Sequence, residues 1–379
     1  MSEVLVLGAG FGGLAAAHEL RRLLPPDDEV VVVASSAQFF VGFAKLWDLV
    51  GARALTEGTA PLEHLDRHGI RFVHAAVTGI DPVERRVETD AGPMTGDGLV
   101  VALGAGFAPA HVALLAQGGH NLYDADALPA MRAALDQLTA GRLVVSILGG
   151  PYLCPPAPYE AALAIDEWLR ARGRRDAVDL AISTPQPLTL PVAGPDASRY
   201  VADQLTDRDV TVLTEHAVEA IEPRTVRFRG GTSLDAAVCF GVPAAAPPPV
   251  LAASPLAGAS GWAEPDPATF RSAFARVYTV GDCTLVPTAT AQLPKAGVFA
   301  EAAGTVAARN LAADLHGGEP ATFDGHGYCY LELPGKLVAT VTGDFYAHPR
   351  PAVTLSPPDA AAYAAKQQWE ADRLRTWLG

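Results

Sequence analysis

The chain has 379 residues, 49% of them hydrophobic, and a formal net charge of −14 at pH 7. This length is enough for two or three domains with sizeable cores, and the negative charge argues against nucleic acid and against simple electrostatic binding to anionic lipid. No stretch approaches the roughly 18 consecutive apolar residues that span a membrane, and no signal segment precedes the first strand pattern, so we expect a cytoplasmic protein.

A glycine-rich turn lies near the start of the chain, between an apolar strand pattern and a helical one at residues 14–24. In Gly-x-Gly-x-x-Gly the first glycine permits the tight turn, the second lets the backbone approach a pyrophosphate, and the third lets helix and strand pack closely. The start of the helix adds unpaired N–H groups and a positive dipole. The pattern predicts a dinucleotide site formed by Gly8, Gly10, Phe11, Gly12 and Gly13.

The adenosine end of that site departs from the usual pattern. The second strand, at 29–34, should end on an Asp or Glu that binds the ribose, but Ser35 and Ser36 follow it. Either one of these serines bonds the ribose hydroxyls more weakly, or the adenosine end is held differently. We also assign to the cofactor Val77, which ends a strand predicted at 71–77.

A second strand-to-helix turn, at 149–160, carries a cysteine among four prolines instead of glycines. It joins a strand at 143–148 to a helix at 160–172, a place where α/β proteins bind ligands. Proline lacks the N–H that a phosphate cradle needs, so Cys154 is a candidate reactive thiol, the alternative being a buried inert cysteine. Glu160 is either a proton shuttle beside it or a residue stabilised by the helix dipole.

The last third of the chain supplies further cofactor candidates. A strand at 276–282 ends on Gly281 and Asp282, whose carboxylate could accept a bond from a ribityl hydroxyl. A helix is predicted at 295–315, a hairpin at 327–333 and 337–342, and a terminal helix at 358–378. The terminal helix has an apolar stripe through Tyr363, Ala371, Leu374 and Leu378, and it either packs on the protein itself or contacts a membrane surface.

Three segments in this order resemble the FAD marks of the pyridine nucleotide–disulfide reductase superfamily: residues 8–13, 101–105 and 278–282. Within it, the segments 154–160 and 294–297 and the late Cys329 resemble sulfide:quinone oxidoreductases and the flavoprotein subunit of flavocytochrome c sulfide dehydrogenase. Ala102 and Gly104, in the second mark, are further cofactor residues by this resemblance, as are Lys295 and Ala296. No cysteine stands near Phe40 or Phe43, where that subunit attaches its flavin, so we expect noncovalent FAD.

The resemblance implies an α/β fold with two Rossmann-like, glutathione-reductase-like domains and a C-terminal α+β segment. We predict an FAD domain at 1–108 and 245–318, a second Rossmann-like domain at 109–244, and the C-terminal segment at 319–379. Cys154 and Cys329 would form a redox disulfide that hydrosulfide attacks, leaving a persulfide on Cys329 while Cys154 faces the flavin. Cys239 and Cys283 are expected in the core. Lys295 would face the flavin N1–C2 carbonyl, and no metal is predicted.

The resulting hypothesis is an FAD-dependent oxidoreductase that oxidises sulfide or a small sulfur compound and passes electrons to a quinone or a cytochrome-type acceptor. We expect the quinone near Phe299, Phe345 and Tyr346, the alternative being that these aromatic residues belong to the core. Two alternatives remain: a type II NADH:quinone reductase, and a flavin-dependent carrier that hands a persulfide to a partner protein. The sequence leaves open a homodimer and a peripheral contact with the inner face of a membrane.

Overall fold

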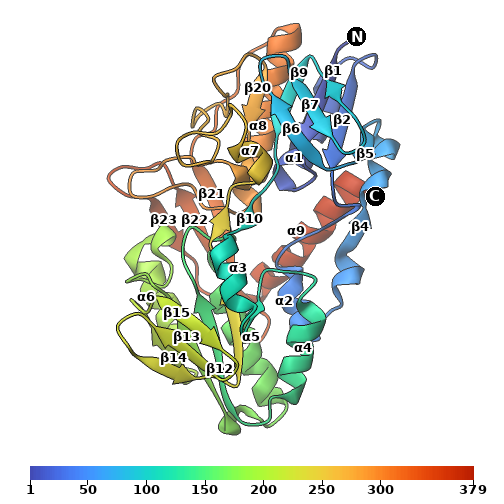
Figure 1. Ribbon diagram of the computed structural model, residues 1–379. Helices are drawn as coiled ribbons and strands as arrows, with labels where there is room; N and C mark the ends of the chain where they lie inside the picture. The colour runs from blue at the N-terminus through green and yellow to red at the C-terminus, as the bar shows by residue number, and fades with distance from the viewer.

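The computed structural model describes residues 1–379 and has two lobes, each built on a parallel sheet of five strands (Figure 1). Valine and leucine fill the central strands of the first sheet, as expected for a sheet covered on both faces. Its strand order is β20-β9-β1-β2-β5, with bounds Val277–Thr279, Gly98–Val101, Glu3–Leu7, Glu29–Ala34 and Arg71–His74.

The second lobe repeats this arrangement, and all its neighbouring strands are also parallel. Its order is β11-β18-β12-β13-β14, with bounds His120–Asn121, Val238–Val242, Gly141–Ile147, Val178–Ser183 and Val210–Leu213. β12 therefore occupies the central position that β1 has in the first sheet. β1 is followed by the glycine turn and α1, and β12 is followed by the proline-rich turn and α5. The chain passes between the lobes at β10 (Gly106–Phe107) and β19 (Ala245–Ala246), which pair with each other.

In the first lobe, α1 (Phe11–Leu23) crosses α8 (Gly297–His316). The two helices meet at glycines: a Cβ on Gly304 would lie 2.2 Å from the carbonyl oxygen of Gly12. The other α-helices of the two lobes are α2 (Ala44–Leu49), α3 (Pro109–Leu115), α4 (Leu128–Gln137), α5 (Ala157–Ala171), α6 (Gly194–Thr206) and α7 (Pro249–Ala252).

Small antiparallel sheets accompany each lobe. One, with the order β6-β7-β8, belongs to the first lobe; the other, β15-β16-β17, belongs to the second, and β3 pairs with β4. The strands of the first small sheet are β6 (Val77–Asp81), β7 (Arg86–Thr89) and β8 (Met94–Thr95). Those of the second are β15 (Val218–Glu222), β16 (Thr225–Phe228) and β17 (Ser233–Asp235), and the remaining pair is β3 (Gln38–Phe40) and β4 (Thr59–Pro61).

The C-terminal segment forms the antiparallel sheet β21 (His326–Leu333), β22 (Leu337–Asp344) and β23 (Ala352–Leu355), followed by α9 (Ala360–Leu378). In Figure 1, α9 runs up from between the two lobes and ends at the C-terminus beside the upper lobe. Its buried side chains are Lys366, Trp369, Glu370, Trp377 and Leu378. The apolar stripe that the sequence suggested is wrong as the main contact face, because Ala371 is exposed and Tyr363 and Leu374 are only half-buried.

The α/β class with two Rossmann-like sheets, predicted from the sequence, is confirmed. Several boundaries differ. α1 begins at Phe11, so two glycines of the turn lie inside the helix, and α5 begins at Ala157, so Glu160 lies in its first turn. The strand predicted at 71–77 is two strands in different sheets, and Val77 begins β6 instead of ending a strand at the nucleotide site.

Candidate functional site

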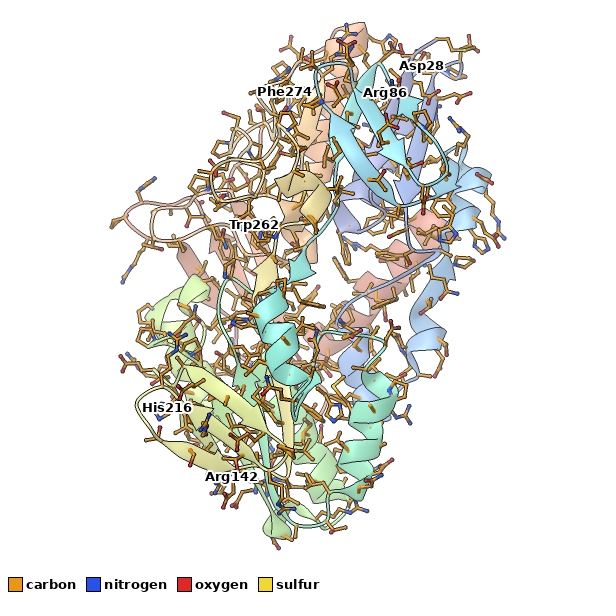
Figure 2. The ribbon with its side chains drawn as sticks, viewed as in Figure 1. Asp28, Arg86, Arg142, His216, Trp262 and Phe274 are labelled. Atoms are coloured by element: carbon orange, nitrogen blue, oxygen red, sulfur yellow. The ribbon has the colours of Figure 1, made fainter.

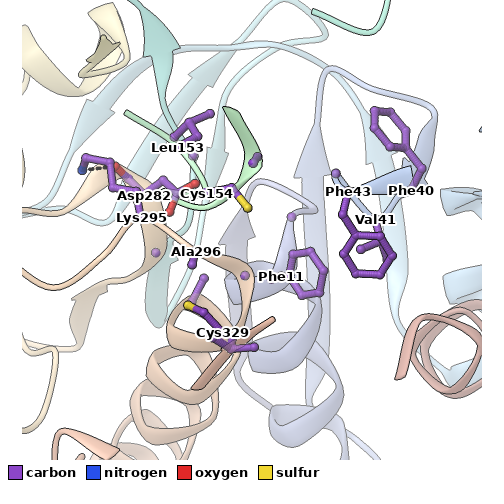
Figure 3. A pocket seen from close by; sticks show the side chains of 18 of the residues that line it. Phe11, Phe40, Val41, Phe43, Leu153, Cys154, Asp282, Lys295, Ala296 and Cys329 are labelled. Atoms are coloured by element: carbon purple, nitrogen blue, oxygen red, sulfur yellow. Dashed lines mark hydrogen bonds between the residues drawn. The ribbon is translucent and has the colours of Figure 1, made fainter. Parts of the chain in front are cut away.

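A cavity of about 380 Å³ lies where the two lobes and the C-terminal segment meet; we call it the cysteine cavity (Figure 3). The first lobe contributes Gly10 and Ala102, the second lobe contributes Cys154, and the C-terminal segment contributes Cys329 and Lys366. Figure 3 shows Phe11, Phe40 and Phe43 on one side and Leu153, Asp282, Lys295 and Ala296 on the other. Segments far apart in sequence thus form one site.

The first glycine turn leaves room for a ligand at one position only. A Cβ on Gly8 would lie 2.2 Å from Ala102 O, and one on Gly13 would lie 1.9 Å from Gly8 O, so both positions are closed by backbone. A Cβ on Gly10 would meet nothing within 4 Å. α1 has no side-chain cap and no acidic residue in its first turn, so its N–H groups are left for an anion. These features fit the pyrophosphate of a dinucleotide.

Asp282 and Lys295 both line the cavity, but only the Lys295 ammonium has hydrogen-bond partners within the chain. No group of the chain donates a hydrogen bond to the Asp282 carboxylate, which fits a ribityl hydroxyl as donor. The Lys295 ammonium donates to the carbonyl oxygens of Asp282 (2.7 Å) and Thr284 (2.9 Å) and lies 3.6 Å from the ring centre of Trp262. Trp262, labelled in Figure 2, sits between the two lobes. Burial lowers the pKa of Lys295 to about 8.

Cys154 is held in an unusual backbone conformation by its proline-rich turn. Its φ is +44°, in the left-handed region that costs a non-glycine residue about 1–2 kcal/mol. The N–H of Cys154 donates to Lys295 O (2.8 Å), and the Tyr123 hydroxyl donates to Cys154 O (3.2 Å). The turn is therefore tied to the start of α8 in the other lobe, and it fixes the thiol at the cavity wall.

Both cavity cysteines are free thiols, as are Cys239 and Cys283, so the predicted Cys154–Cys329 bridge is not formed in this structure. Burial raises the pKa of Cys154 to about 12; Glu160 also raises it, while the Lys366 and Lys45 ammonium groups act against the shift. Burial raises the pKa of Cys329 as well, and Cys154 and Glu160 add to that. Cys239 and Cys283 are buried in cores away from the cavity.

Glu160 belongs to a buried ion cluster that joins α5, β21 and α9. Lys366 Nζ donates to Glu160 Oε1 (3.2 Å) and Glu332 Oε2 (2.7 Å), and Glu332 also accepts from Trp47 Nε1 (3.0 Å). Burial raises the pKa of Glu160, an effect that Lys366 opposes and Glu332 reinforces. Burial alone would lower the pKa of Lys366, but the two carboxylates reverse this and raise it.

A third cationic group, Lys45 on α2, also lines the cavity. Its ammonium donates to the carbonyl oxygen of Tyr123 and lies 5.7 Å from the centre of that ring. Burial lowers the pKa of Lys45 to about 8, and the negative charge that Cys154 and Asp124 can carry works in the opposite direction. Since this pKa lies above neutral pH, Lys45 stays mainly protonated there, and its charge lowers the pKa of Cys154.

The structure brings most of the predicted site residues to the cavity: Gly10, Phe11, Gly12, Ala102, Gly104, Gly281, Asp282, Lys295, Ala296, Cys154, Cys329 and Glu160 line it. Gly8 and Gly13 lie behind its wall, and Ser35, Ser36 and Val77 lie outside it. Ser36 uses its hydroxyl on the backbone of Gln38 (2.7 Å). Phe299 and Phe345 are buried and pack edge to face with their ring centres 4.8 Å apart, whereas Tyr346 is half-buried; the quinone position expected near these three residues stays a prediction.

Sequence reasoning missed Lys45 and Lys366, although a signal existed. The chain has only four lysines, Lys45, Lys295, Lys336 and Lys366. The first, second and fourth line the cysteine cavity, and Lys336 lines a neighbouring one. Every lysine of the chain therefore lies at one of two adjoining cavities.

A family model described as pyridine nucleotide-disulphide oxidoreductase matches residues 2–297, more than half of the chain. The chain belongs to this family. A mouse mitochondrial protein named sulfide:quinone oxidoreductase is 24% identical over 367 residues, which cover 92% of this chain and 79% of that one. An Aquifex aeolicus sulfide-quinone reductase is 29% identical over 239 residues, 60% of this chain and 54% of its own length.

Solved structures agree on the fold of this oxidoreductase. The crystal structure of the Aquifex aeolicus sulfide:quinone oxidoreductase superposes with a TM-score of 0.90 at 23% identity, covering 100% of this chain and 91% of that one. An NAD-dependent persulfide reductase from A. fulgidus superposes with a TM-score of 0.71 at 20% identity, and the match covers 90% of this chain and 64% of that one. No helix of the protein is both long and apolar enough to cross a membrane, and no group of three or more His, Cys, Asp or Glu side chains could hold a metal ion.

Proposed function

We propose that the protein is a flavoenzyme that oxidises sulfide, or a small sulfur compound, through Cys154 and Cys329, with a quinone as electron acceptor. One observation carries the proposal: two cysteines 175 positions apart in sequence line the cavity that also contains the open glycine turn. The relatives named sulfide:quinone oxidoreductase support the choice of sulfide and quinone.

FAD is the cofactor that the cavity fits, and it supplies a two-electron acceptor when bound. The N–H groups of α1 would hold its pyrophosphate and the Asp282 carboxylate a ribityl hydroxyl. No cysteine lies between Gln38 and Leu46 in the cavity wall, so the attachment is noncovalent. Acid precipitation should then leave all the yellow colour in the supernatant, and colour remaining with the chain would contradict this.

The thiol chemistry starts from the oxidised pair. Hydrosulfide attacks Sγ of Cys329; a bond forms between the two sulfurs, the Cys154–Cys329 bond breaks, and its electron pair leaves on Cys154 as a thiolate. Cys329 then carries the persulfide. Lys45 and Lys366 favour the negative charge on Cys154, whereas burial and Glu160 oppose it.

The proline turn disfavours the NADH alternative. Three of the residues that would face a pyrophosphate there, Pro151, Pro155 and Pro156, have no N–H to donate. The N-terminus of α5 also carries an acidic residue, Glu160, in its first turn, which repels an anion.

Single-turnover spectroscopy on cysteine variants tests the proposal. Cys154→Ser and Cys329→Ser should keep FAD and lose sulfide-driven bleaching of the flavin band, whereas Cys239→Ser and Cys283→Ser should retain both. Peptide mapping of the oxidised protein should find Cys154 joined to Cys329. Bleaching that survives in either cavity variant would contradict the cysteine mechanism. Bleaching without quinone-supported turnover would favour the persulfide carrier.

A further inference from the structure

A small pocket lies behind Cys329, between β21, β22 and the segment 190–193, and we call it the rear pocket. It leaves about 10 Å³ to the centre of a water-sized atom, which is room for about one such atom. Cys329 lines both the rear pocket and the cysteine cavity, whereas Cys154 lines the cysteine cavity alone. Of the two cavity cysteines, Cys329 is therefore the one with space on a second side.

The rear pocket is apolar. Apart from Cys329 and Tyr330, every side chain that lines it is a hydrocarbon or a proline ring, with Leu190, Val192 and Phe345 among them. A water molecule in a protein interior needs two or more polar partners, and these walls do not supply them. We therefore expect the pocket to be dry and to suit a neutral atom better than a charged one.

The walls of the rear pocket are held firmly. The N–H of Leu190 donates to Ser198 Oγ (3.1 Å), and the Thr189 hydroxyl donates to the Ser198 carbonyl oxygen (2.7 Å), so the start of the 190–193 segment is tied to α6. On the opposite wall, Cys329 lies across from Val341 in the β21–β22 register. Because these contacts resist expansion, the pocket limits the size of what it can accept.

The geometry of thiol–disulfide exchange gives this pocket a use. The attacking sulfur approaches along the line of the S–S bond that breaks, on the side away from the leaving sulfur. In the proposed step the leaving sulfur belongs to Cys154, which borders only the cysteine cavity. The side of Cys329 that does not face this cavity is the rear pocket. Cys154 has no such pocket on its own far side, which makes Cys329 the sulfur open to in-line attack.

We propose that the rear pocket is a sulfur-binding pocket, which receives the sulfur of hydrosulfide as it attacks Cys329 and then holds it as the outer atom of the persulfide. A bond forms between that sulfur and Sγ of Cys329, the Cys154–Cys329 bond breaks, and its electron pair leaves on Cys154. The hydrogen stays on the outer sulfur, so the group in the pocket is neutral. The inference rests on the proposed function and narrows its substrate to sulfide, since a thiol with a carbon substituent exceeds the pocket.

The first test compares two nucleophiles in stopped-flow bleaching of the FAD-loaded protein, at equal concentrations of their anions. Methanethiolate has a methyl group where hydrosulfide has a hydrogen, and it is the more basic and hence the stronger nucleophile in water. One methylene in an apolar pocket changes a rate by about 10–200-fold, so methanethiolate should bleach the wild type slower than hydrosulfide by such a factor. Equal rates would overturn the size limit.

Variants of Val192, which is half-buried and lines the rear pocket alone, locate the limit. Val192→Ala widens the pocket and should bring the methanethiolate rate close to the hydrosulfide rate. Val192→Leu narrows it and should slow hydrosulfide by about 10–200-fold. Val212→Ala is the matched control, a half-buried valine of the same lobe that lines neither cavity, and it should behave as the wild type. An unchanged ratio of rates in Val192→Ala would contradict the pocket.

The second test uses crystals and, in its first part, no sulfide. Xenon binds in dry apolar cavities, so under xenon pressure Val192→Ala should show a xenon atom beside Cys329 and Val192→Leu should show none. No xenon in Val192→Ala would overturn the dry pocket. In sulfide-treated wild-type crystals, sulfur anomalous scattering should place the outer sulfur in the rear pocket, and a peak in the cysteine cavity would refute the assignment. A wild type that neither nucleophile bleaches would instead refute the proposed function, whatever the xenon result.

Discussion

The two lobes place the same architecture, a central parallel strand followed by a turn and a helix, at the same cavity, yet their turns have opposite chemistry. The β1–α1 turn is made of glycines, leaves open space beside Gly10 and has no acidic residue in its helix start. The β12–α5 turn has four prolines, a cysteine with positive φ and Glu160. The first turn leaves helix N–H groups free for an anion, whereas the second has prolines that lack an N–H and presents a thiol.

This difference shows which part of a Rossmann unit fixes the ligand. The strands and their register position the turn at the sheet edge in both lobes, and on the proposed function the turn composition decides between phosphate and sulfur. The C-terminal segment contributes to both turns, because Cys329 and Lys366 face the second one while Trp369 stacks on Phe11 of the first (ring centres 5.3 Å apart). The following predictions alter one lobe at a time.

The largest expected effect comes from Lys366→Met, which leaves Glu160 and Glu332 without their shared cation. Removing one partner of a buried ion cluster costs about 3–5 kcal/mol, so the free energy of unfolding should fall by that amount in denaturant titrations. Lys336→Met is the matched control, since Lys336 is exposed and makes no ion pair. An unchanged midpoint for Lys366→Met would show that the cluster contributes nothing to stability.

Substitutions in the glycine turn of the first lobe should lower the free energy of unfolding by less than Lys366→Met does, and one of them should also weaken FAD binding. Gly13→Ala forces a Cβ against the Gly8 carbonyl and should cost about 3 kcal/mol of stability. Gly10→Ala meets no atom of the chain, so the melting temperature of the FAD-free protein should stay the same. The added methyl occupies the open space, and FAD affinity should drop by about tenfold or more, or about 1.4 kcal/mol. Equal FAD affinity would place the pyrophosphate elsewhere.

The smallest effect concerns His18 on α1, which contacts the Trp377 carbonyl of α9 (3.0 Å). Burial, with a contribution from His68, lowers the pKa of His18 to about 4. The unfolded chain therefore binds a proton near pH 6.5 that the folded chain refuses, and the free energy of unfolding should fall as pH drops from 6.5 to 4, by about 1–3 kcal/mol. His18→Gln should flatten this part of the pH–stability curve; an unchanged slope would assign it to other groups.

Much of the fold and part of the site were predictable from local patterns. Gly8 to Gly13, the apolar strands and the Pro-flanked Cys154 are contiguous signals, and they led to residues that form one cavity. The ion cluster was not predictable, because Lys366 and Glu160 are 206 positions apart and α9 by itself reads as a helix with balanced surface charge. The strand boundary at 71–77 was wrong, because this stretch breaks into β5 and β6 and Val77 lies in another sheet; the residues that would hold the adenosine end stay a prediction.

The central claim is that the second turn is a thiol site and not a nucleotide site. Stopped-flow mixing of the FAD-loaded protein with either sulfide or NADH, followed at the flavin band without any acceptor, tests this directly. The account predicts rapid bleaching by sulfide and none by NADH. Rapid bleaching by NADH with none by sulfide would contradict it, and would make the proline turn a nucleotide site in spite of its missing N–H groups.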